Sequence, residues 1–462
     1  MNKITIFLIS FMIAIIFSGC EFKSDTNEVP KPLSKDEQVT LKMAVNFEFL
    51  ALQDYMNYFS TKFPNLEIKV VSWKNVLAPG PAYNEELDAF IRTEQPDIIL
   101  FDNNTTFGRW ASEGYLFELD PLIKADKFDI ENMNSKVIDY IKIKGGGKLF
   151  GLAPTFSSEA LFYNKDLFDT YNIEYPHNQM SWEEVMQLAA HFPTEGDEKS
   201  RIYGFARNSD FNGFSMPFYM VKMMGEDSGL SFFDSTYTNM TIDTQGWKNI
   251  FELLLNGVKS GFIYDENNLK ATNDTIQYPD VMRRNMFAVG RAAMTVDDFS
   301  FVNDRLEYAK QLDGISFPNW DVVSSPVQPA LPNETKHFIV NELFGISAQS
   351  GNLRAAWEFI KFVNSEEAAK LQSKSGYSRN RLQTRTEYSK ERDGRDLSPF
   401  YMLEPSSTDA AIMPPKLYMP LNRLISEEVN SLLIGEKTLD EALNVLQQKG
   451  QEELIKATLA SE

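Results

Sequence analysis

The residues that could do chemistry in this chain are carboxylates, amides and aromatic rings rather than nucleophiles or metal ligands. The sequence has one cysteine, Cys20, and it has no G-x-S-x-G nucleophile elbow. Residues 144–151 read KGGGKLFG, which lacks the Ser or Thr and the first glycine of a phosphate-binding loop, so a hairpin turn between residues 141–143 and 149–150 is expected. The histidines show no metal-ligand spacing and are expected to be structural or on the surface: His177, His191 and His337. We therefore expect no enzyme activity, no metal and no cofactor.

Asp297 and Asp298 form the most suggestive carboxylate doublet for acid–base chemistry. Adjacent residues of a strand face opposite sides, so the two carboxylates cannot act together on one bond. Two roles stay open for this doublet, a solvated or capping role and hydrogen bonding to a ligand.

Polar and aromatic residues follow the ends of several expected strands, where ligands bind in open α/β sheets. Aromatic faces beside amides and carboxylates suit a sugar, because rings stack on its C–H faces and fixed acceptors take its hydroxyl protons. Trp73 and Trp320 fit a binding cleft and core packing equally well. The core is expected to hold Trp110, Trp182, Trp247 and Trp357. The predicted ligand contacts are Asn46, Glu48, Trp73, Asp102, Asn104, Phe156, Ser157, Asn208, Asp297, Asp298, Phe299 and Trp320.

The elements that position these residues alternate between strand and helix. Hydrophobic patterning predicts strands at about residues 40–45, 66–70 and 96–101, with helices at about 52–63 and 85–93 between them. This βαβ pattern predicts an α/β fold with a largely parallel sheet that helices cover on both faces. Two capping boxes predict further helix starts, at Ser181 with Glu184 and at Thr438 with Glu441.

Length and composition bound the class of protein. The 462 residues are 43% hydrophobic, which is enough for two or three lobes with separate cores. A formal net charge of −20 argues against nucleic-acid binding, which needs a basic face. With one cysteine, no disulfide can form within the chain.

The N-terminus predicts export. Lys3 precedes an apolar run at residues 4–17, which is too short to span a bilayer and fits the hydrophobic region of a signal peptide. The Ser-Gly-Cys ending resembles a lipobox, which implies cleavage after residue 19 and a lipid on Cys20 that holds the protein at the outer face of the cell membrane. Residues 20–37 are polar and would form a flexible tether. An ordinary signal peptide with an incidental cysteine is the alternative.

Several stretches carry a family resemblance: FPNLEIKV (63–70), QPDIIL (95–100), GYLFELDPLI (114–123), FAVGRAAMTV (287–296) and the long run 343–373. In their residues and in their order along the chain, these stretches resemble the extracellular solute-binding proteins of ABC importers, from about residue 40 to the C-terminus. The resemblance implies the type II periplasmic-binding-protein fold, in which each of two lobes has a mostly parallel sheet covered by helices. The implied lobes are residues 38–154 plus about 319–362, and residues 155–318 plus about 363–462, joined by crossing segments.

The same resemblance implies a monomeric, non-enzymatic protein that closes its lobes on a small ligand and delivers the ligand to ABC permease subunits. The predicted contacts favour a mono- or oligosaccharide. Many sugar-binding members of the family carry a tryptophan in the first strand, where this chain has MAVNF (43–47), so the identity of the sugar stays open. A lipoprotein sensor on the same scaffold and a secreted polysaccharide-acting enzyme are the alternatives.

Overall fold

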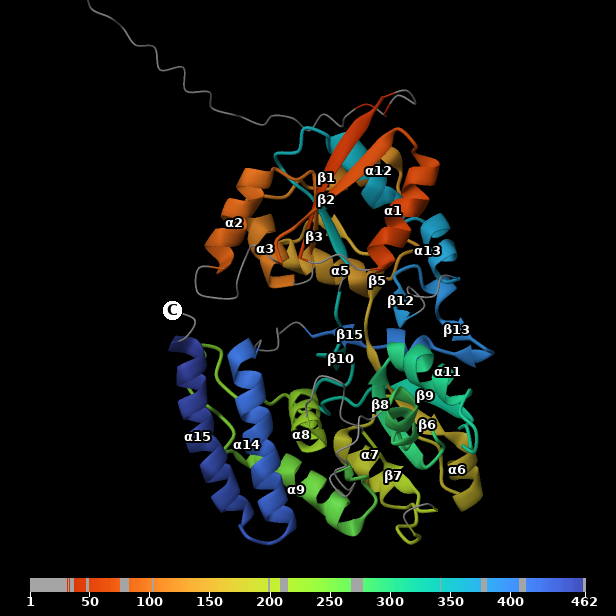
Figure 1. Ribbon diagram of the computed structural model, residues 1–462, viewed down its shortest axis with the longest axis vertical. Helices are drawn as coiled ribbons and strands as arrows, with labels where there is room; N and C mark the ends of the chain where they lie inside the picture. The colour runs from red at the N-terminus through yellow and green to blue at the C-terminus, as the bar shows by residue number, and fades with distance from the viewer. Residues whose placement is uncertain are drawn as a thin grey trace, which may run out of the picture.

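Two sheets with their covering helices lie one above the other in the computed structural model, and short strands run between them (Figure 1). The residues that the structure describes are 31, 33, 37–46, 50–74, 83–101, 104–197, 200–207, 215–266, 277–340, 342–374, 380–406 and 413–459. Among these residues, no helix combines the length and the apolar character that a membrane crossing requires.

The first sheet has the strand order β2-β1-β3-β11-β4. Strand β1 pairs in parallel with β2 and β3, whereas β11 runs antiparallel to both β3 and β4. The bounds are β1 Val39–Val45, β2 Leu66–Ser72, β3 Ile98–Phe101, β4 Gly151–Leu152 and β11 Leu343–Ile346.

Helices of the first lobe surround this sheet, and the buried rings of Trp110 and Trp357 lie in its core, as expected. The sequence expectation of a hairpin at residues 141–150 is wrong, because residues 135–144 form a helix that ends at the glycine run. Gly146 and Gly147 have positive φ values of 65° and 93°, which explains the glycines without a phosphate loop. The helices are α1 Leu50–Lys62, α2 Tyr83–Glu94, α3 Asn104–Ser112, α4 Asp120–Asp126, α5 Ser135–Lys144, α12 Leu353–Val363 and α13 Glu366–Gln372.

The second sheet has the order β7-β8-β6-β9, and only β7 and β8 are parallel. Its bounds are β6 Glu159–Asn164, β7 Tyr203–Phe205, β8 Ala292–Asp298 and β9 Trp320–Ser324. Trp182 and Trp247 are buried in the core of this lobe, as expected. The helices are α6 Lys165–Tyr171, α7 Trp182–Ala189, α8 Met216–Asp227, α9 Gln245–Ser260, α10 Tyr278–Arg283, α11 Glu307–Ala309, α14 Pro415–Leu433 and α15 Leu439–Leu459, with a π-helical turn at Val302–Leu306.

Both sheets are therefore mixed, and the prediction of mostly parallel sheets is wrong in this respect. Parallel neighbours need a crossover helix on the sheet face, as between β1, β2 and β3. Strand β11 instead arrives from the second lobe and enters the first sheet in the opposite direction. The βαβ pattern near the N-terminus contains no information about the direction of this later strand.

Short strand pairs lie between the two sheets (Figure 1). Strand β5 (Thr155–Phe156) pairs with β12 (Leu382–Gln383), and β10 (Glu334–Thr335) pairs with β15 (Glu404–Pro405). The predicted lobe boundaries remain a prediction, although the pairing of β9 with β6 would fit a boundary after residue 324. A further hairpin joins β13 (Glu391–Arg392) to β14 (Arg395–Asp396), and 3-10 turns occupy Thr386–Tyr388 and Ser398–Tyr401.

The capping box predicted at α7 is confirmed. The Ser181 hydroxyl accepts a hydrogen bond from the Glu184 N–H at 3.2 Å, and the Glu184 carboxylate accepts one from the Ser181 N–H at 2.7 Å. We expect Ser181→Ala to lower the free energy of unfolding by about 1 kcal/mol, because an N-terminal amide of α7 loses its partner. Urea denaturation measures this loss. Ser60→Ala, on the exposed face of α1, is the control, and equal losses in both variants would contradict the prediction.

Candidate ligand-binding site

The predicted ligand contacts divide first by whether the structure describes them. Glu48, Asp102 and Asn208 lie outside the described residues, as does the predicted lipid site, Cys20. Asn104 is the first residue of α3, and only its backbone is described. The roles predicted for these residues stay predictions.

The aromatic candidates pack into the protein. Trp73, Phe156, Phe299 and Trp320 are each at most 4% exposed. Phe156 stacks on Phe338 with ring centroids 4.8 Å apart, and the Arg395 guanidinium lies over Trp320, 4.6 Å from the ring centroid. In this conformation these rings are held by protein contacts and the structure does not gather them around a common site, so their ligand contacts remain a prediction.

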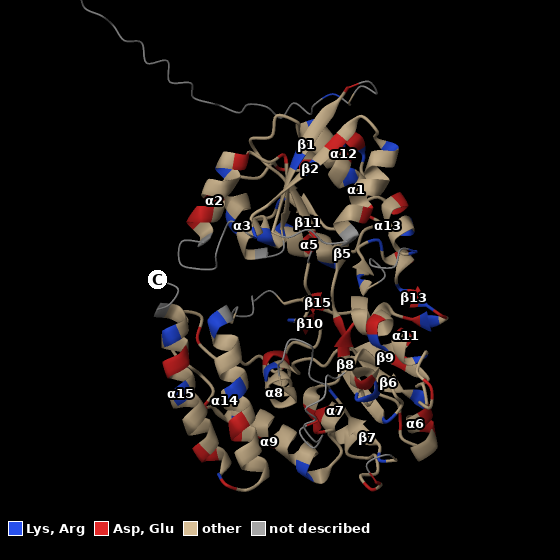
Figure 2. Cartoon of the chain, viewed as in Figure 1, with Lys and Arg blue, Asp and Glu red and all other residues tan. Residues whose placement is uncertain are grey.

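The polar candidates lie at strand ends in both lobes. Asn46 follows β1, and its carbonyl accepts a hydrogen bond from the Ser72 hydroxyl at 2.5 Å. Ser157 follows β5 and exchanges backbone hydrogen bonds with Ile339. Asp297 and Asp298 end β8, and Figure 2 shows acidic residues in red at the end of β8 nearest the first lobe. Of these residues, Asp297 enters a larger charged cluster.

This junction cluster consists of Glu159, Arg207, Asp227, Asp297 and His337. Arg207 Nη1 lies 2.6 Å from Asp297 Oδ2. His337 Nε2 lies 2.9 Å from Asp227 Oδ1, and His337 Nδ1 lies 3.7 Å from Glu159 Oε2. The five groups come from β6, the end of β7, the end of α8, β8 and the connection between β10 and β11, so the fold brings together five segments that are distant in sequence.

Local structure holds each member of the junction cluster in place. The guanidinium of Arg207 also donates to the Val296 carbonyl and lies 4.9 Å from the centroid of the Tyr219 ring. Asp227 accepts a hydrogen bond from the Trp182 indole at 2.8 Å. Asp298 points to a different partner, since it accepts from the Ser300 N–H at 2.7 Å. The two carboxylates of the doublet thus serve different partners, as expected for adjacent strand residues.

Burial and charge act in opposite directions on the pKa values of the cluster. Burial raises the pKa of Glu159 and of Asp297, although the neighbouring cations of His337 and Arg207 oppose the shift. Burial lowers the pKa of His337, but the carboxylates of Glu159 and Asp227 outweigh burial and raise it to about 10. Burial also opposes the charge of Arg207, yet the Asp297 carboxylate raises its pKa. The cluster therefore places three acidic side chains beside two basic ones.

Three buried polar atoms of the cluster lack a hydrogen-bond partner among the described residues, and one of them, His337 Nε2, is ion-paired with Asp227 Oδ1 at 2.9 Å. Among the described residues, neither the buried Glu159 Oε2 nor the buried Arg207 Nε has a hydrogen-bond partner. Buried polar groups are nearly always satisfied, so an acceptor and a donor left over in one cluster call for polar partners that the described residues do not supply. The arrangement can bind hydroxyl groups. In the parts of the chain that the structure describes, no three His, Cys, Asp or Glu residues are arranged to hold a metal ion.

Sequence reasoning missed most of the junction cluster. His337 was expected to be structural or on the surface, and it is structural, since it forms a charged link between Asp227 and Glu159. Arg207 directly precedes Asn208, the residue that the sequence singled out in the same loop. The sequence pattern indicated this loop and Asp297 as parts of a site. No sequence pattern connects Asp227 with His337, because their contact depends on the fold.

Comparison with known proteins identifies the scaffold. A family model described as bacterial extracellular solute-binding protein matches residues 48–370, more than half of the chain. The structure resembles a sugar transporter from Rhizobium etli in an open conformation, with a TM-score of 0.61, 18% identity, and coverage of 90% of this chain and 99% of that one.

Two more solved structures share the fold. The sugar-binding protein MalE from Xanthomonas citri has a TM-score of 0.58 and 17% identity, with 91% of this chain and 98% of that one covered. An ABC substrate-binding protein from Listeria monocytogenes in complex with cycloalternan has a TM-score of 0.54 and 21% identity, with 91% and 99% covered. These matches confirm the expected periplasmic-binding-protein fold. The chain therefore belongs to the family of bacterial extracellular solute-binding proteins, whose members bind solutes for ABC transporters rather than catalyse reactions.

Proposed function

We propose that this protein captures a mono- or oligosaccharide at the junction cluster and delivers it to an ABC permease in the membrane. The observation that supports the sugar best is the pairing of a leftover acceptor, Glu159 Oε2, with a leftover donor, Arg207 Nε, beside the Asp297 carboxylate. Hydroxyl groups both donate and accept hydrogen bonds, so a polyhydroxylated ligand satisfies both kinds of group. Proteins of the same fold that were solved with carbohydrates, such as the one bound to cycloalternan, support the same class.

Each residue has a separate task in this proposal. Glu159 and Asp297 accept hydroxyl protons, and Arg207 donates to a ring or hydroxyl oxygen. Asp227 and His337 do not need to touch the sugar, because they hold Glu159 in place. Ligand groups that also meet the first lobe, near Asn46 and the predicted contacts Asp102 and Asn104, would bridge the lobes and shift the population toward the closed form.

Lipid on Cys20 completes the proposal. A lipid-anchored cysteine with a tether at residues 20–37 would hold the binding protein at the outer face of the membrane beside its permease. We expect labelled fatty acid to be attached covalently to the native chain but not to the Cys20→Ser variant, which retains the apolar run. Equal labelling of both chains would contradict the proposed lipid anchor on Cys20.

A saccharide screen, repeated with an Asp297→Asn variant, tests whether the ligand is a sugar and whether it binds at the junction cluster. A saccharide at about a hundred times its Kd should stabilise the fold by about 2.7 kcal/mol in a thermal-shift assay. We expect Asp297→Asn to weaken the Kd at 25 °C by about tenfold or more, because the amide is a weaker acceptor for hydroxyl protons than the carboxylate.

The control for this experiment is Asp243→Asn, an exposed acid of the second lobe. Its Kd should equal that of the native chain. Stabilisation by amino acids or peptides alone would contradict the proposal of a sugar ligand, but it would not contradict the role as a solute-binding protein. An unchanged Kd in Asp297→Asn, with saccharide binding intact, would remove the junction cluster as the site.

A further inference from the structure

Glu159 differs from the other acids of the junction cluster in how its carboxylate is paired. Arg207 Nη1 lies 2.6 Å from Asp297 Oδ2. His337 Nε2 lies 2.9 Å from Asp227 Oδ1, so each base of the cluster has one acid at close range. The contact of Glu159 is longer, at 3.7 Å between its Oε2 and His337 Nδ1. Glu159 is therefore the third acid in a cluster that holds two bases.

The hydrogen bonds of the three acids show the same difference. Asp227 accepts one from the Trp182 indole at 2.8 Å, and Asp297 accepts one from the Asp298 N–H at 3.0 Å. Glu159 Oε2 is buried and has no hydrogen-bond partner in the part of the chain that the structure describes. Burial penalises the charge of this carboxylate, and no hydrogen bond to Oε2 offsets the penalty, so the protonated form is favoured.

Charged groups face Glu159 from four other segments of the chain. Burial is the largest influence, and it raises the pKa of Glu159. The cations of His337 and Arg207 lower this pKa, whereas the carboxylates of Asp227 and Asp297 raise it. Burial and the two acids outweigh the two bases, and the pKa of Glu159 lies above its ordinary value.

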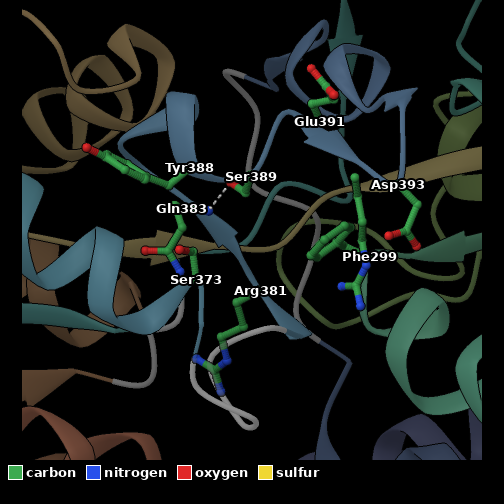
Figure 3. A pocket seen from close by; sticks show the side chains of 9 residues that line it. Phe299, Ser373, Arg381, Gln383, Tyr388, Ser389, Glu391 and Asp393 are labelled. Carbon is green, nitrogen blue, oxygen red and sulfur yellow. Dashed lines mark hydrogen bonds between the residues drawn. The ribbon is translucent and has the colours of Figure 1, made fainter.

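Two more charged side chains lie in this region without belonging to the junction cluster. Asp298 is opposite Glu159 in the pairing of β6 with β8, and as an acid it favours the protonated form of Glu159. Arg381 lines the pocket shown in Figure 3 together with Phe299, and no residue of the junction cluster lines that pocket. The cations that act most strongly on Glu159 are therefore those of the junction cluster.

A ligand hydroxyl reverses this balance. A hydroxyl that donates to Oε2 supplies the missing hydrogen bond, and a hydrogen bond to the charged form of a carboxyl favours that form. We propose that Glu159 is a proton switch, which holds a proton while the site is empty and releases it to solvent when a saccharide hydroxyl binds. The switch rests on the proposed function, since it requires the saccharide to bind at the junction cluster. Because protons and saccharide compete for one carboxylate, capture weakens as the medium becomes acidic.

Infrared difference spectroscopy on the full chain in mild detergent tests the empty site without a ligand. Between about pH 9 and about pH 5, the native chain should gain the band of one protonated carboxyl that Glu159→Gln does not gain. The matched control is Glu252→Gln, an exposed glutamate of α9, which should give the native signal. Equal spectra for the native chain and Glu159→Gln would overturn the switch, because Glu159 would then keep one protonation state.

Calorimetry tests the release of the proton, with the saccharide that gives the largest shift in the thermal-shift screen as the probe. Binding heats in two buffers of different ionisation enthalpy should show that the native chain releases up to about one proton. Its Kd should rise by up to about tenfold for each pH unit of acidification. Glu159→Gln cannot ionise, so it should bind more weakly, release no proton and keep its Kd within about twofold over the same pH range.

The outcomes separate the switch from the proposed function. Saccharide binding without proton release, at a Kd that does not change with pH, would overturn the switch and leave the proposed function in place. No saccharide binding at any pH would contradict the proposed function itself. If circular dichroism shows that Glu159→Gln is unfolded, the proton count and the pH dependence of the native chain decide, because neither requires the variant.

Discussion

Replacing Glu342 by alanine is expected to lower the free energy of unfolding by about 3–5 kcal/mol, the range for removing one partner of a buried charge pair. Glu342 is 1% exposed and directly precedes β11. Its carboxylate accepts hydrogen bonds from Tyr55 Oη at 3.0 Å, Thr155 Oγ1 at 2.9 Å and Arg381 Nη1 at 2.7 Å. These donors belong to α1, β5 and the residues before β12, so one side chain ties together four distant segments where the chain passes between the lobes.

Urea denaturation of the full chain measures the loss. Glu342→Gln keeps an oxygen acceptor for Tyr55 and Thr155, so we expect it to lose less than Glu342→Ala. Glu252→Ala, an exposed glutamate of α9, is the control and should change the free energy by no more than about 0.5 kcal/mol. A loss below about 1 kcal/mol in Glu342→Ala would show that the carboxylate does not hold these segments together.

His337→Gln is expected to lower the free energy of unfolding by about 3 kcal/mol at pH 7, because Asp227 and Glu159 lose the cation between them. The effect should depend on pH. The pKa of His337 is about 10 in the folded chain, whereas an unfolded histidine has a pKa of about 6.5. The folded state therefore holds a proton that the unfolded state has lost. The stabilisation is complete below about pH 6.5 and is lost as the pH rises through about 10.

Denaturation at several pH values between 7 and 9.5 checks this dependence. The difference between the native chain and His337→Gln should shrink by about 1.4 kcal/mol for each pH unit. The groups that face His337 are Glu159, Asp227, Glu226 and, across Glu159, Arg207, and none of them is altered in the variant. A difference that stays constant with pH would mean that the imidazole is neutral in the folded chain.

Local patterns predicted the elements of the first lobe well. The strands expected at residues 40–45, 66–70 and 96–101 are β1, β2 and β3, displaced by no more than two residues at either end. Hydrophobic periodicity and helix capping depend on residues that are close together in the chain, so they can be recognised in a sequence. The direction of β11 was not predicted, because it depends on how the chain returns from the other lobe. The residues around Ile141 were assigned to a hairpin because glycines mark turns and the end of a helix equally well.

The candidate site was only partly predictable. Strand ends indicated Asp297, which lies in the junction cluster, and they also indicated Phe156 and Trp320, which are buried. An aromatic residue after a strand has the same sequence pattern whether it faces a ligand or fills a core. The link between Glu159 and His337 joins residues far apart in the chain, and no periodicity connects them.

The order of strands in the first sheet also bears on when this protein can finish folding during its synthesis. Strand β4 joins the sheet through β11, and β11 begins only at Leu343. Until the ribosome has passed that residue, β3 keeps an open edge and β4 lacks the neighbour it has in the finished sheet. Contacts between segments so distant in sequence form slowly. A protein of an extracellular family gains from this delay, because an incompletely folded chain is easier to thread through a membrane than a finished lobe.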